Sequence, residues 1–270
     1  MSLSKKHIKT GLKKMYKSFL RTNKNNDDLL NYCPVCAKKT DFRSFSYQFY
    51  FEKFYEHGFI FSPFQFETLN LKHYKCKTCG ANDRDRLMAL YLNDYLKNKK
   101  GKDLKLLDLA PGKALPVFFK NLDRVKYRSA DLYRKDVDDK VDITDMNIYD
   151  NETYDIFICS HILEHIEDDL KAMSELYRIT KTNGIGLCLV PIMLSLDKSL
   201  ENKEYLQTED LRWKYFGQDD HVRMYSKNDF ITRLERVGFK VEQYGQEFFG
   251  KDVFESLGLD KKSILYVVEK

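Results

Sequence analysis

The sequence predicts an α/β fold in which a doubly wound, largely parallel sheet follows a small cysteine-rich module. From Leu104 to the last residues, strand-like apolar runs alternate with amphipathic segments. This alternation is the pattern of a parallel sheet with helices on both faces. The final apolar runs, at 239–244 and 264–268, indicate a terminal β-hairpin. Two Cys-x-x-Cys pairs stand before the alternation, at 33–36 and 76–79.

Length and composition are those of a soluble globular protein. The 270 residues, 43% of them hydrophobic and 32% charged, can bury a large core in one or two domains. No apolar run approaches the length of a membrane span and no signal-peptide core follows the start, so we expect a cytoplasmic location. Six cysteines, four of them in Cys-x-x-Cys pairs, indicate metal ligation rather than disulfides.

Residues 1–28 are expected to form a basic amphipathic helix that ends in a polar hinge. Positions 1–24 hold eight Lys and Arg and no acid; without them the net charge of +5 becomes −3 for the rest of the chain. Only this arm is basic, so the body is not expected to be a nucleic-acid clamp. The apolar stripe of residues 4–21 is expected to pack on the body, with contact to a membrane surface or RNA as the alternative.

Residues 29–82 are predicted to be a zinc-binding module. Each Cys-x-x-Cys pair directs two thiolates at one ion, and two pairs complete a tetrahedral site. Because all four ligands are cysteines, the zinc would be structural; four reduced, buried cysteines are the alternative. The Phe and Tyr residues between the pairs are expected to form a small core or cover the main domain. The predicted ligands are Cys33, Cys36, Cys76 and Cys79.

A helix is predicted over 83–99, with Leu87 and Leu90 on its inner face. Arg84 and Arg86 stand at its start, directly after the second cysteine pair. Their guanidinium groups either hold a carboxylate or phosphate of a ligand or tie the small module to the main domain. The sequence leaves both interpretations open.

The remaining elements follow from apolar runs and turn signals. Residues 182–184, Thr-Asn-Gly, are predicted to form a left-handed stop between a helix and the next strand. Helices are predicted at 113–122, 167–180 and 227–237, and strands at 104–109, 125–130, a short run ending near Asp142, 154–159, 185–190, 239–244 and 264–268.

Three of these strands end in an acid. Asp108 is followed by a Gly-containing turn, Asp131 comes 23 residues later, and Asp142 ends the third short run. Because the carboxyl ends of parallel strands meet at one edge, the three acids predict a nucleoside pocket with a carboxylate for the ribose hydroxyls. The turn lacks the full G-x-G-x-x-G pattern, so an NAD-dependent dehydrogenase is the least favoured enzyme class.

These motifs resemble those of class I S-adenosylmethionine-dependent methyltransferases, whose sheet has seven strands and ends in an antiparallel strand. The resemblance covers residues 84–269 and includes Asp108-Leu109-Ala110-Pro111-Gly112 and Ser160-His161-Ile162-Leu163-Glu164-His165-Ile166. The paired cysteines and the run Phe216–Tyr225 are similar to a bacterial subgroup with a zinc-ribbon-like N-terminus. One departure is Ala110, which replaces the first glycine of the usual turn.

The resemblance implies S-adenosylmethionine as the cofactor and assigns the domain to residues 83–270. Asp108 and Gly112 would border its methionyl part, Asp131 would bind the ribose, and Asp142 with the amide of Ile143 would contact the adenine. The implied cofactor-binding residues are Asp108, Ala110, Gly112, Asp131, Leu132, Asp142, Ile143 and Ser160.

Residues 191–225 are too long for a plain connection and are predicted to be a substrate-facing insertion. His221 is expected to be a general base oriented by Asp219 or Asp220, with Arg223 gripping an anionic group of the acceptor. His161, at a strand end, is the competing base, whereas His165 is expected to pack or cap its loop.

The sequence therefore favours a methyltransferase with an N-terminal zinc module that methylates an oxygen of a sugar, glycan or other small polar acceptor. One alternative is an RNA methyltransferase whose module and basic arm grip RNA; the acidic body counts against it. The other is a non-catalytic scaffold that uses zinc and cofactor binding to recruit a partner. The acceptor atom and the oligomeric state are left open.

Overall fold

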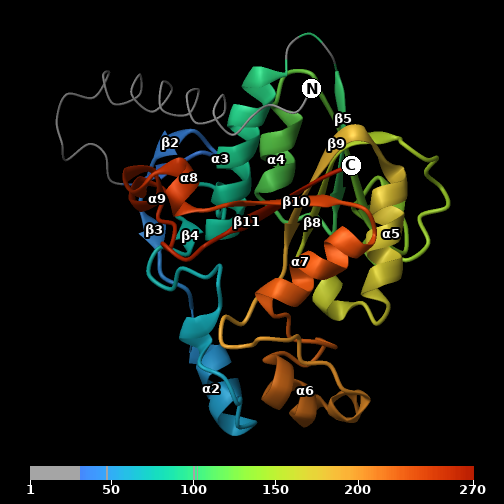
Figure 1. The fold of residues 1–270 in the computed structure, drawn as a ribbon. Coiled ribbons are helices and arrows are strands. Elements are labelled where there is room, and N and C mark those ends of the chain that lie inside the picture. The colour runs from blue at the N-terminus through green and yellow to red at the C-terminus, as the bar shows by residue number, and fades with distance from the viewer. Residues whose placement is uncertain (1–30, 47, 100, 102) are drawn as a thin grey trace.

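The computed structural model describes residues 31–270 apart from residues 47, 100 and 102, and a seven-stranded sheet runs through its centre (Figure 1). The strand order is β10-β11-β9-β8-β5-β6-β7. The five neighbouring strands β9, β8, β5, β6 and β7 pair in parallel, whereas β11 is antiparallel to both β9 and β10. The strands are β5 (Leu104–Leu109), β6 (Val125–Asp131), β7 (Asp139–Lys140), β8 (Tyr154–Ser160), β9 (Thr180–Leu189), β10 (Lys240–Tyr244) and β11 (Leu265–Glu269).

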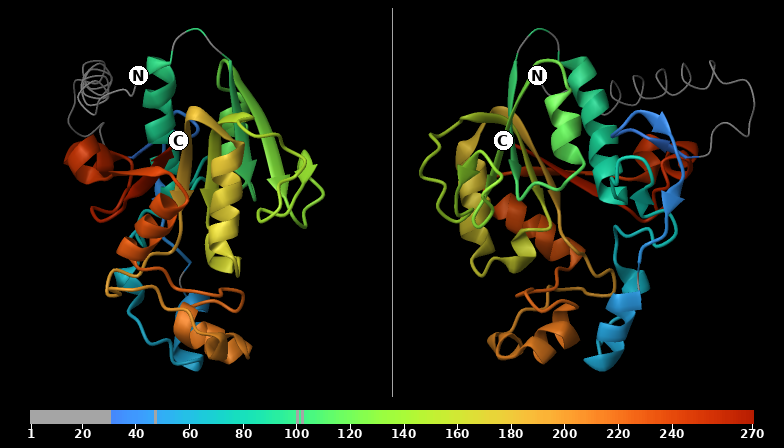
Figure 2. Two further views of the ribbon diagram at one scale, coloured as in Figure 1. Left: turned by 45° about the vertical axis from the view of Figure 1, so that its right-hand side comes forward. Right: turned by 180° about the vertical axis from the view of Figure 1, so that it is seen from behind.

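Helices cover both faces of the sheet (Figure 2), which confirms the doubly wound prediction. The first face packs against α3 (Asp83–Asn98), α4 (Leu115–Lys120), α8 (Gln246–Phe249) and α9 (Lys251–Ser256). The second face packs against α5 (Asp169–Ile179) and α7 (Lys227–Arg236). Successive residues of β5 explain the two cores: Leu106 belongs to the first and Leu107 to the second, because side chains alternate along a strand.

The start of α3 is fixed by local sequence. Asn82 is the N-cap; its side chain accepts from the amide of Asp85, and the carboxylate of Asp85 accepts from the amide of Asn82 at 2.9 Å. This reciprocal pair satisfies two amides that a helix end otherwise leaves unpaired. Since Asn82 follows Cys79 by three residues, the second cysteine pair leads straight into this helix.

The boundary between α5 and β9 differs from the prediction. The helix ends at Ile179, and β9 already begins at Thr180 instead of Ile185. The left-handed residue is present, with Asn183 at a φ of 62°, but it lies inside the strand, where the register with β8 shifts. Tyr154 of β8 pairs with Thr180, so β9 begins before the turn signal at residues 182–184. Pairing between strands therefore outweighs local turn chemistry here.

Residues 31–82 occupy two places in the molecule. The cysteine pairs lie in two small antiparallel ribbons, formed by β1 (Tyr32–Cys33) with β2 (Lys38–Lys39) and by β3 (Phe42–Arg43) with β4 (Lys75–Cys76). The aromatic segment between them, with α2 (Gln48–Glu56), extends below the sheet in Figure 1.

The aromatic segment packs against the insertion rather than on itself. The insertion carries α6 (Glu209–Phe216), which lies beside α2 (Figure 1). Buried Met193, Phe216 and Met224 of the insertion form a small core with the half-buried Phe59 and Phe66. The aromatic residues thus cover the edge of the main domain, one of the two arrangements expected for them.

The predicted basic helix of residues 1–28 lies outside the described residues. Among the helices that the structure does describe, none combines the length and the apolar character that crossing a membrane requires.

Candidate active site

The carboxyl ends of four neighbouring strands place predicted cofactor residues along one edge of the sheet. Asp108 is the penultimate residue of β5, Asp131 ends β6, Asp142 follows β7 by two residues, and Ser160 ends β8. In open α/β sheets, ligands bind in the crevice outside these strand ends. The sheet order β8-β5-β6-β7 makes these four positions neighbours.

The turn after β5 has a backbone shape that glycine usually provides. Ala110 has a φ of 47°, in the left-handed region that costs a non-glycine residue about 1–2 kcal/mol. The Ala110 amide donates to the carbonyl of Ala130 at 2.8 Å, and the Pro111 carbonyl accepts from the Arg134 guanidinium. A Cβ on Gly112 would meet nothing within 4 Å. The turn therefore keeps its shape despite the missing glycine, and its backbone is open to a ligand.

Asp131 and Asp142 are each held by the chain that follows them. One oxygen of Asp131 accepts from the amides of Tyr133 and Arg134 at 2.7 and 2.9 Å. One oxygen of Asp142 accepts from the amide and the hydroxyl of Thr144, both at 2.8 Å. Within the described part of the chain, the second oxygen of each has no hydrogen-bond partner, so each acid is oriented and keeps one acceptor for a ligand.

Apolar side chains lie beside these two acids. Leu132, directly after Asp131, is 36% exposed and Tyr133 is 81% exposed, whereas Ile143 after Asp142 is buried. Small-molecule sites combine apolar surface with a few oriented polar groups. This pair of acids with adjoining apolar surface fits a nucleoside.

Asp108 is the buried acid of this edge. Its side chain is 2% exposed and accepts a hydrogen bond from the Tyr127 hydroxyl at 3.1 Å. Burial raises the pKa of the Asp108 carboxyl to about 7. A cationic group beside it would favour the ionised form, which fits the amino end of a methionyl group.

A cavity of about 280 Å³ opens between this edge, the aromatic segment and the insertion. It has two chemically different walls. One wall is aromatic, and the other carries a cation, a carboxylate and imidazoles. The aromatic wall includes Phe45, Tyr50, Phe54, Phe66 and Phe216, and the polar wall includes Arg84, His161, Glu164, His165 and His221.

His161 follows β8 and is held from both sides. Its backbone is left-handed, with a φ of 57°, and its amide donates to the Leu189 carbonyl at 2.8 Å. Nδ1 lies 3.0 Å from a Glu164 oxygen, and Nε2 accepts from the Arg84 guanidinium at 2.7 Å. Burial and the charge of Arg84 lower the pKa of His161 to about 4. His161 is therefore neutral at pH 7, and Arg84 covers its basic nitrogen.

His221 also lines the cavity, but its orienting partner differs from the prediction. Its Nδ1 lies 3.3 Å from the carbonyl of Phe216, and neither Asp219 nor Asp220 holds it. Asp220 instead contacts Nδ1 of His165 at 3.3 Å. Nε2 of His221 is buried without a partner among the described residues, so it is a buried nitrogen of this wall that is free to accept a proton. Burial lowers the pKa of His221.

Arg223 does not reach the cavity, so the structure argues against its expected grip on the acceptor. It is 4% exposed and donates to the carbonyls of Leu163, Ile166 and Glu167 and to the Glu201 carboxylate. Its role is to fix the 163–167 loop, which carries two residues of the polar wall.

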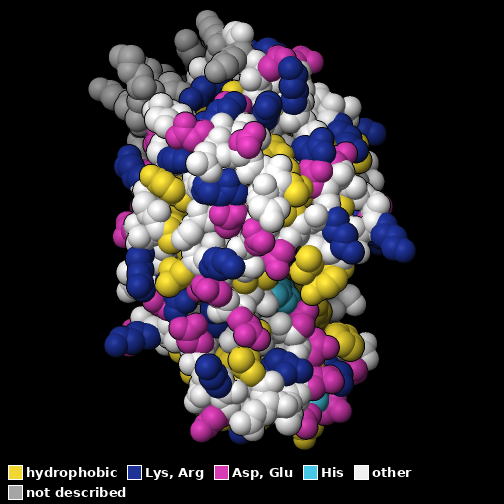
Figure 3. All heavy atoms as spheres, turned by 90° about the vertical axis from the view of Figure 1, so that its right-hand side faces the viewer, with side chains coloured by type: hydrophobic (Ala, Val, Ile, Leu, Met, Phe, Trp, Pro, Cys, Tyr) yellow, Lys and Arg dark blue, Asp and Glu magenta, His cyan; other side chains and the backbone are white. Residues whose placement is uncertain are grey.

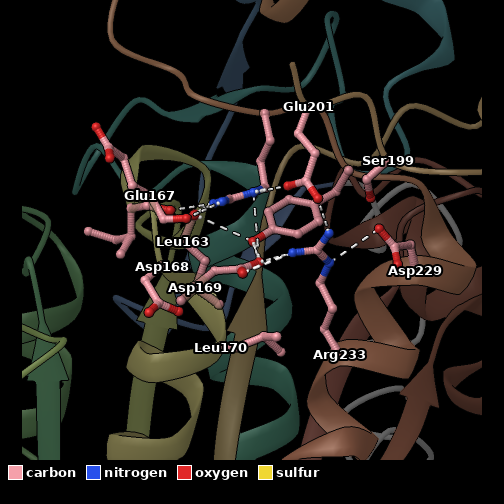
Figure 4. A network of polar contacts seen from close by, with 12 residues as sticks. Leu163, Glu167, Asp168, Asp169, Leu170, Ser199, Glu201, Asp229 and Arg233 are labelled. Carbon is pink, nitrogen blue, oxygen red and sulfur yellow. Dashed lines mark hydrogen bonds and ion pairs between the residues drawn. The ribbon is translucent and has the colours of Figure 1, made fainter. Parts of the chain in front are cut away.

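Arg223 belongs to a polar network whose members Asp169, Glu201 and Arg233 are labelled in Figure 4. Asp169 accepts from the guanidinium of Arg233 at 2.9 and 3.0 Å and from the Tyr225 hydroxyl at 2.5 Å. Arg233 also contacts Glu201 and Asp229. Buried charges are tolerated only when they are paired and hydrogen-bonded. The network therefore fastens the insertion to α5 and α7 and leaves no charge of its own for a ligand.

The two arginines at the start of α3 divide the roles left open by the sequence. Arg86 is fully buried and donates to carbonyls on both sides, including those of Ala81 and Leu257 at 3.1 and 2.7 Å. Its guanidinium also lies 4.0 Å from the centre of the Phe42 ring. Arg86 thus ties the cysteine-rich module to the main domain, whereas Arg84 lines the cavity and contacts His161.

The four predicted metal ligands form one cluster. The sulfur atoms of Cys33, Cys36, Cys76 and Cys79 all lie within 4.8 Å of one another, and none is in a disulfide. The 3.7 Å between the sulfurs of Cys33 and Cys79 matches the separation of about 3.8 Å across a tetrahedral Zn–S site with bonds of about 2.3 Å. The Cys79 amide lies 3.4 Å from the Cys76 sulfur. The donor set and its geometry fit zinc.

Glu164 is a candidate that the sequence reasoning did not single out. It is fully buried, and neither carboxylate oxygen has a hydrogen bond of good geometry within the described chain. Its sequence signal is an acid between Leu163 and His165, three positions after His161. That spacing alone did not distinguish a buried acid from an exposed one, because the loop has no regular period.

The family comparison agrees with this geometry. The family model described as "Methyltransferase domain" matches residues 81–244. The chain is a class I S-adenosylmethionine-dependent methyltransferase and belongs to this family. No match was found among curated protein sequences.

Solved structures with similar folds include several methyltransferases. A SAM-dependent methyltransferase from Archaeoglobus fulgidus is 13% identical, with 72% of this chain and 97% of that chain covered and a TM-score of 0.45. One from Aquifex aeolicus is 16% identical over 65% and 86%, with a TM-score of 0.41. For the CurJ carbon methyltransferase, at 12% identity and a TM-score of 0.45, the match covers 67% of this chain and 52% of that chain.

Proposed function

We propose that this methyltransferase methylates a hydroxyl oxygen of a small polar acceptor, such as a sugar or a glycan unit, bound in the 280 Å³ cavity. The two-walled lining of the cavity carries the proposal. Aromatic rings can cover the C–H face of a sugar while the polar wall binds its hydroxyls. The volume lies near the lower end of small-molecule pockets, which begin at about 300 Å³.

Surface charge favours a small acceptor over RNA. On the face shown in Figure 3, Lys and Arg side chains are interspersed with Asp and Glu. Nucleic-acid surfaces instead gather positive charge along the phosphate backbone. The net charge of −3 outside the first 24 residues points the same way.

The cofactor is proposed to lie along the strand-end edge. The free oxygen of Asp131 would accept from the ribose hydroxyls, with Leu132 beside the ring. Asp142 and Ile143 would contact the adenine. The turn of Ala110 and Gly112, with Asp108 beneath it and Ser160 next to it, would hold the methionyl part. When bound, S-adenosylmethionine supplies a methyl group that an oxygen accepts by displacement, with the C–S electron pair staying on sulfur.

The chain's own residues would orient the acceptor and remove its proton. His221 is the group on which loss of the hydroxyl proton depends, because its buried Nε2 has no hydrogen-bond partner among the described residues. Arg84 lines the cavity, held by its hydrogen bond to Nε2 of His161, and its remaining N–H groups would donate to a second oxygen of the acceptor and so fix the orientation of the sugar ring. Aromatic side chains of the α2 segment would limit water around the reacting oxygen.

The cysteine cluster is proposed to bind one structural zinc ion. All four ligand positions are occupied by thiolates, so the ion has no open position for chemistry. Its contribution is mechanical: Cys76 and Cys79 directly precede α3, whose first turn carries Arg84. The zinc would therefore hold one residue of the acceptor wall in place.

Replacing Asp131 with alanine is expected to weaken S-adenosylmethionine binding by about 1.5–3 kcal/mol, the range for hydrogen bonds to a charged group. The change removes the proposed acceptor for the ribose hydroxyls while its two partner amides remain in an exposed loop. Calorimetry measures the dissociation constant directly. Asp136→Ala, which removes another acid of the same loop, is the control and should leave the dissociation constant close to that of wild type. An unchanged constant in Asp131→Ala would place the ribose elsewhere.

The acceptor class can be tested by transfer of a radioactive methyl group into cell extract. We expect the label in the small-molecule or glycan fraction, as an ether stable to mild base. Label in the RNA fraction, with binding to immobilised RNA that falls steeply with salt, would contradict the proposal. A carboxylate ester, which mild base hydrolyses, would contradict methylation of a hydroxyl.

A further inference from the structure

We propose that Glu164, His165 and His221 bind a divalent transition-metal ion in the polar wall of the acceptor cavity. Each of the three offers one ligand atom, and these atoms lie within 4.8 Å of one another. All three residues line the cavity. Two imidazoles and one carboxylate form a donor set that holds zinc and related ions while leaving open positions. This site is separate from the four-cysteine cluster.

The imidazoles are already oriented for such an ion. Nδ1 of His221 lies 3.3 Å from the Phe216 carbonyl, and Nδ1 of His165 lies 3.3 Å from an Asp220 oxygen. A metal-bound histidine almost always gives its other N–H to a carbonyl or carboxylate, which fixes the tautomer. These contacts leave Nε2 of both rings for the metal. Nε2 of His165 is 3.9 Å from Glu164, so a small closure would bring both into one coordination sphere.

Burial gives an independent reason for a cation. Glu164 is fully buried and His221 is 2% exposed, yet both carboxylate oxygens and Nε2 of His221 have no hydrogen bond among the described residues. Leaving such groups unpaired costs several kcal/mol for a charge.

The neighbouring groups meet this need only in part. Nδ1 of His161 carries the proton, since Nε2 accepts from Arg84, and it faces one Glu164 oxygen at 3.0 Å outside good hydrogen-bond geometry; Arg84 bonds to His161 instead of Glu164. A divalent ion would pair with the carboxylate and the free Nε2 at once.

The metal would refine the proposed function, on which this part of the inference rests. The acceptor hydroxyl would occupy an open position, and the positive ion would lower the pKa of that hydroxyl. The O–H bond then breaks with its proton passing to solvent water, and the oxygen keeps the electron pair with which it accepts the methyl group. His221 would act as a ligand and not as the direct proton acceptor.

The site can be tested with Co²⁺ and the full chain carrying zinc at its cysteines. Equilibrium dialysis should give one Co²⁺ per chain, with visible d–d absorption but no thiolate charge-transfer band, since the cysteines are occupied. Glu164→Gln and His221→Ala should each weaken Co²⁺ binding by about 100-fold or more, because loss of even an outer-shell partner costs about 10–100-fold. His57→Gln, a histidine outside the cavity lining, should bind like wild type.

A second measurement keeps the test valid if a variant is less stable. Co²⁺ should raise the melting temperature of wild type and His57→Gln but not of Glu164→Gln, which loses its buried charge and should fold at least as well as wild type. Equal binding and equal thermal shifts in wild type and Glu164→Gln would overturn the inference.

The same experiment separates this inference from the proposed function. If Co²⁺ does not bind at Glu164, His165 and His221 but His221→Ala still loses hydroxyl methylation, the metal site is wrong and the proposed function stands. If Co²⁺ binds and no hydroxyl acceptor is methylated, the metal site stands and the proposed function fails.

Discussion

His221→Ala is expected to lower turnover by about 10²–10⁴-fold, the usual effect of removing a group that takes up or directs a reacting proton. The imidazole is buried against the acceptor cavity, and its Nε2 has no partner among the described residues. The same loss follows whether Nε2 accepts the proton or binds an ion that acidifies the hydroxyl. Affinity for S-adenosylmethionine should hardly change, because the proposed cofactor residues lie at the carboxyl ends of β5, β6, β7 and β8 and in the turns that follow them. Turnover and calorimetric affinity measure the two effects separately.

His161→Ala is the comparison that distinguishes the two candidate histidines. Its Nε2 already accepts from Arg84 at 2.7 Å, so we expect a smaller loss of turnover, mainly from disordering Arg84. His57→Ala serves as the control, because His57 contacts Asp210 and does not line the cavity. If the His161 variant fails and the His221 variant remains active, the reacting proton leaves at the end of β8 and His221 only supports the insertion.

Cys76→Ser is expected to release the proposed zinc ion and to lower the melting temperature by about 10 °C or more. Structural zinc sites have apparent binding free energies of about 10–16 kcal/mol in small peptides. A loss of 1 kcal/mol lowers Tm by about 2–4 °C in domains of about 150–250 residues, so losing even part of this energy has a large effect. Cys76 is fully buried, pairs with Phe42 between β3 and β4, and lies close to the carbonyls that Arg86 binds.

Metal analysis and thermal unfolding test this expectation together. Cys188→Ala is the matched control: Cys188 is buried in β9, away from the cluster, so its loss should cost only a small cavity and leave the zinc content at one. Loss of zinc from Cys76→Ser with unchanged melting would exclude a structural role. We further expect the Cys76 variant to lose turnover, since α3 begins at Asp83, four residues after Cys79, and carries Arg84 into the acceptor wall.

Much of the main fold was predictable because its signals are local. Apolar runs such as 104–109 and 154–159 fill strands that are buried on both faces. The capping pair of Asn82 and Asp85 fixes the start of α3 from four consecutive residues. The carboxyl ends of parallel strands share an edge, so the strand pattern alone predicts that the acids Asp108 and Asp131 lie close together, and β5 and β6 are indeed neighbours.

The short elements were not predictable in the same way. Helices α2, α6, α8 and α9 have at most nine residues, and so short a helix depends on tertiary contacts more than on its own propensity. The aromatic residues around α2 gave no clear period. Their place against the insertion, where Phe59 packs with Phe216, depends on shape complementarity between segments more than 150 residues apart in the chain.

By itself, the sequence determined the class I methyltransferase fold, the acids at the strand ends and the four-cysteine cluster, because the apolar runs, the strand-end residues and the Cys-x-x-Cys pairs are local signals, and general rules of sheet and metal geometry bring them together. The tertiary structure decided the acceptor wall. In the folded chain Arg84 contacts His161, which lies 77 residues later in the sequence. Arg223 binds the 163–167 loop, and Asp220 contacts His165 instead of His221. Such contacts depend on how loops from distant segments pack, where no periodic pattern records the direction of a side chain.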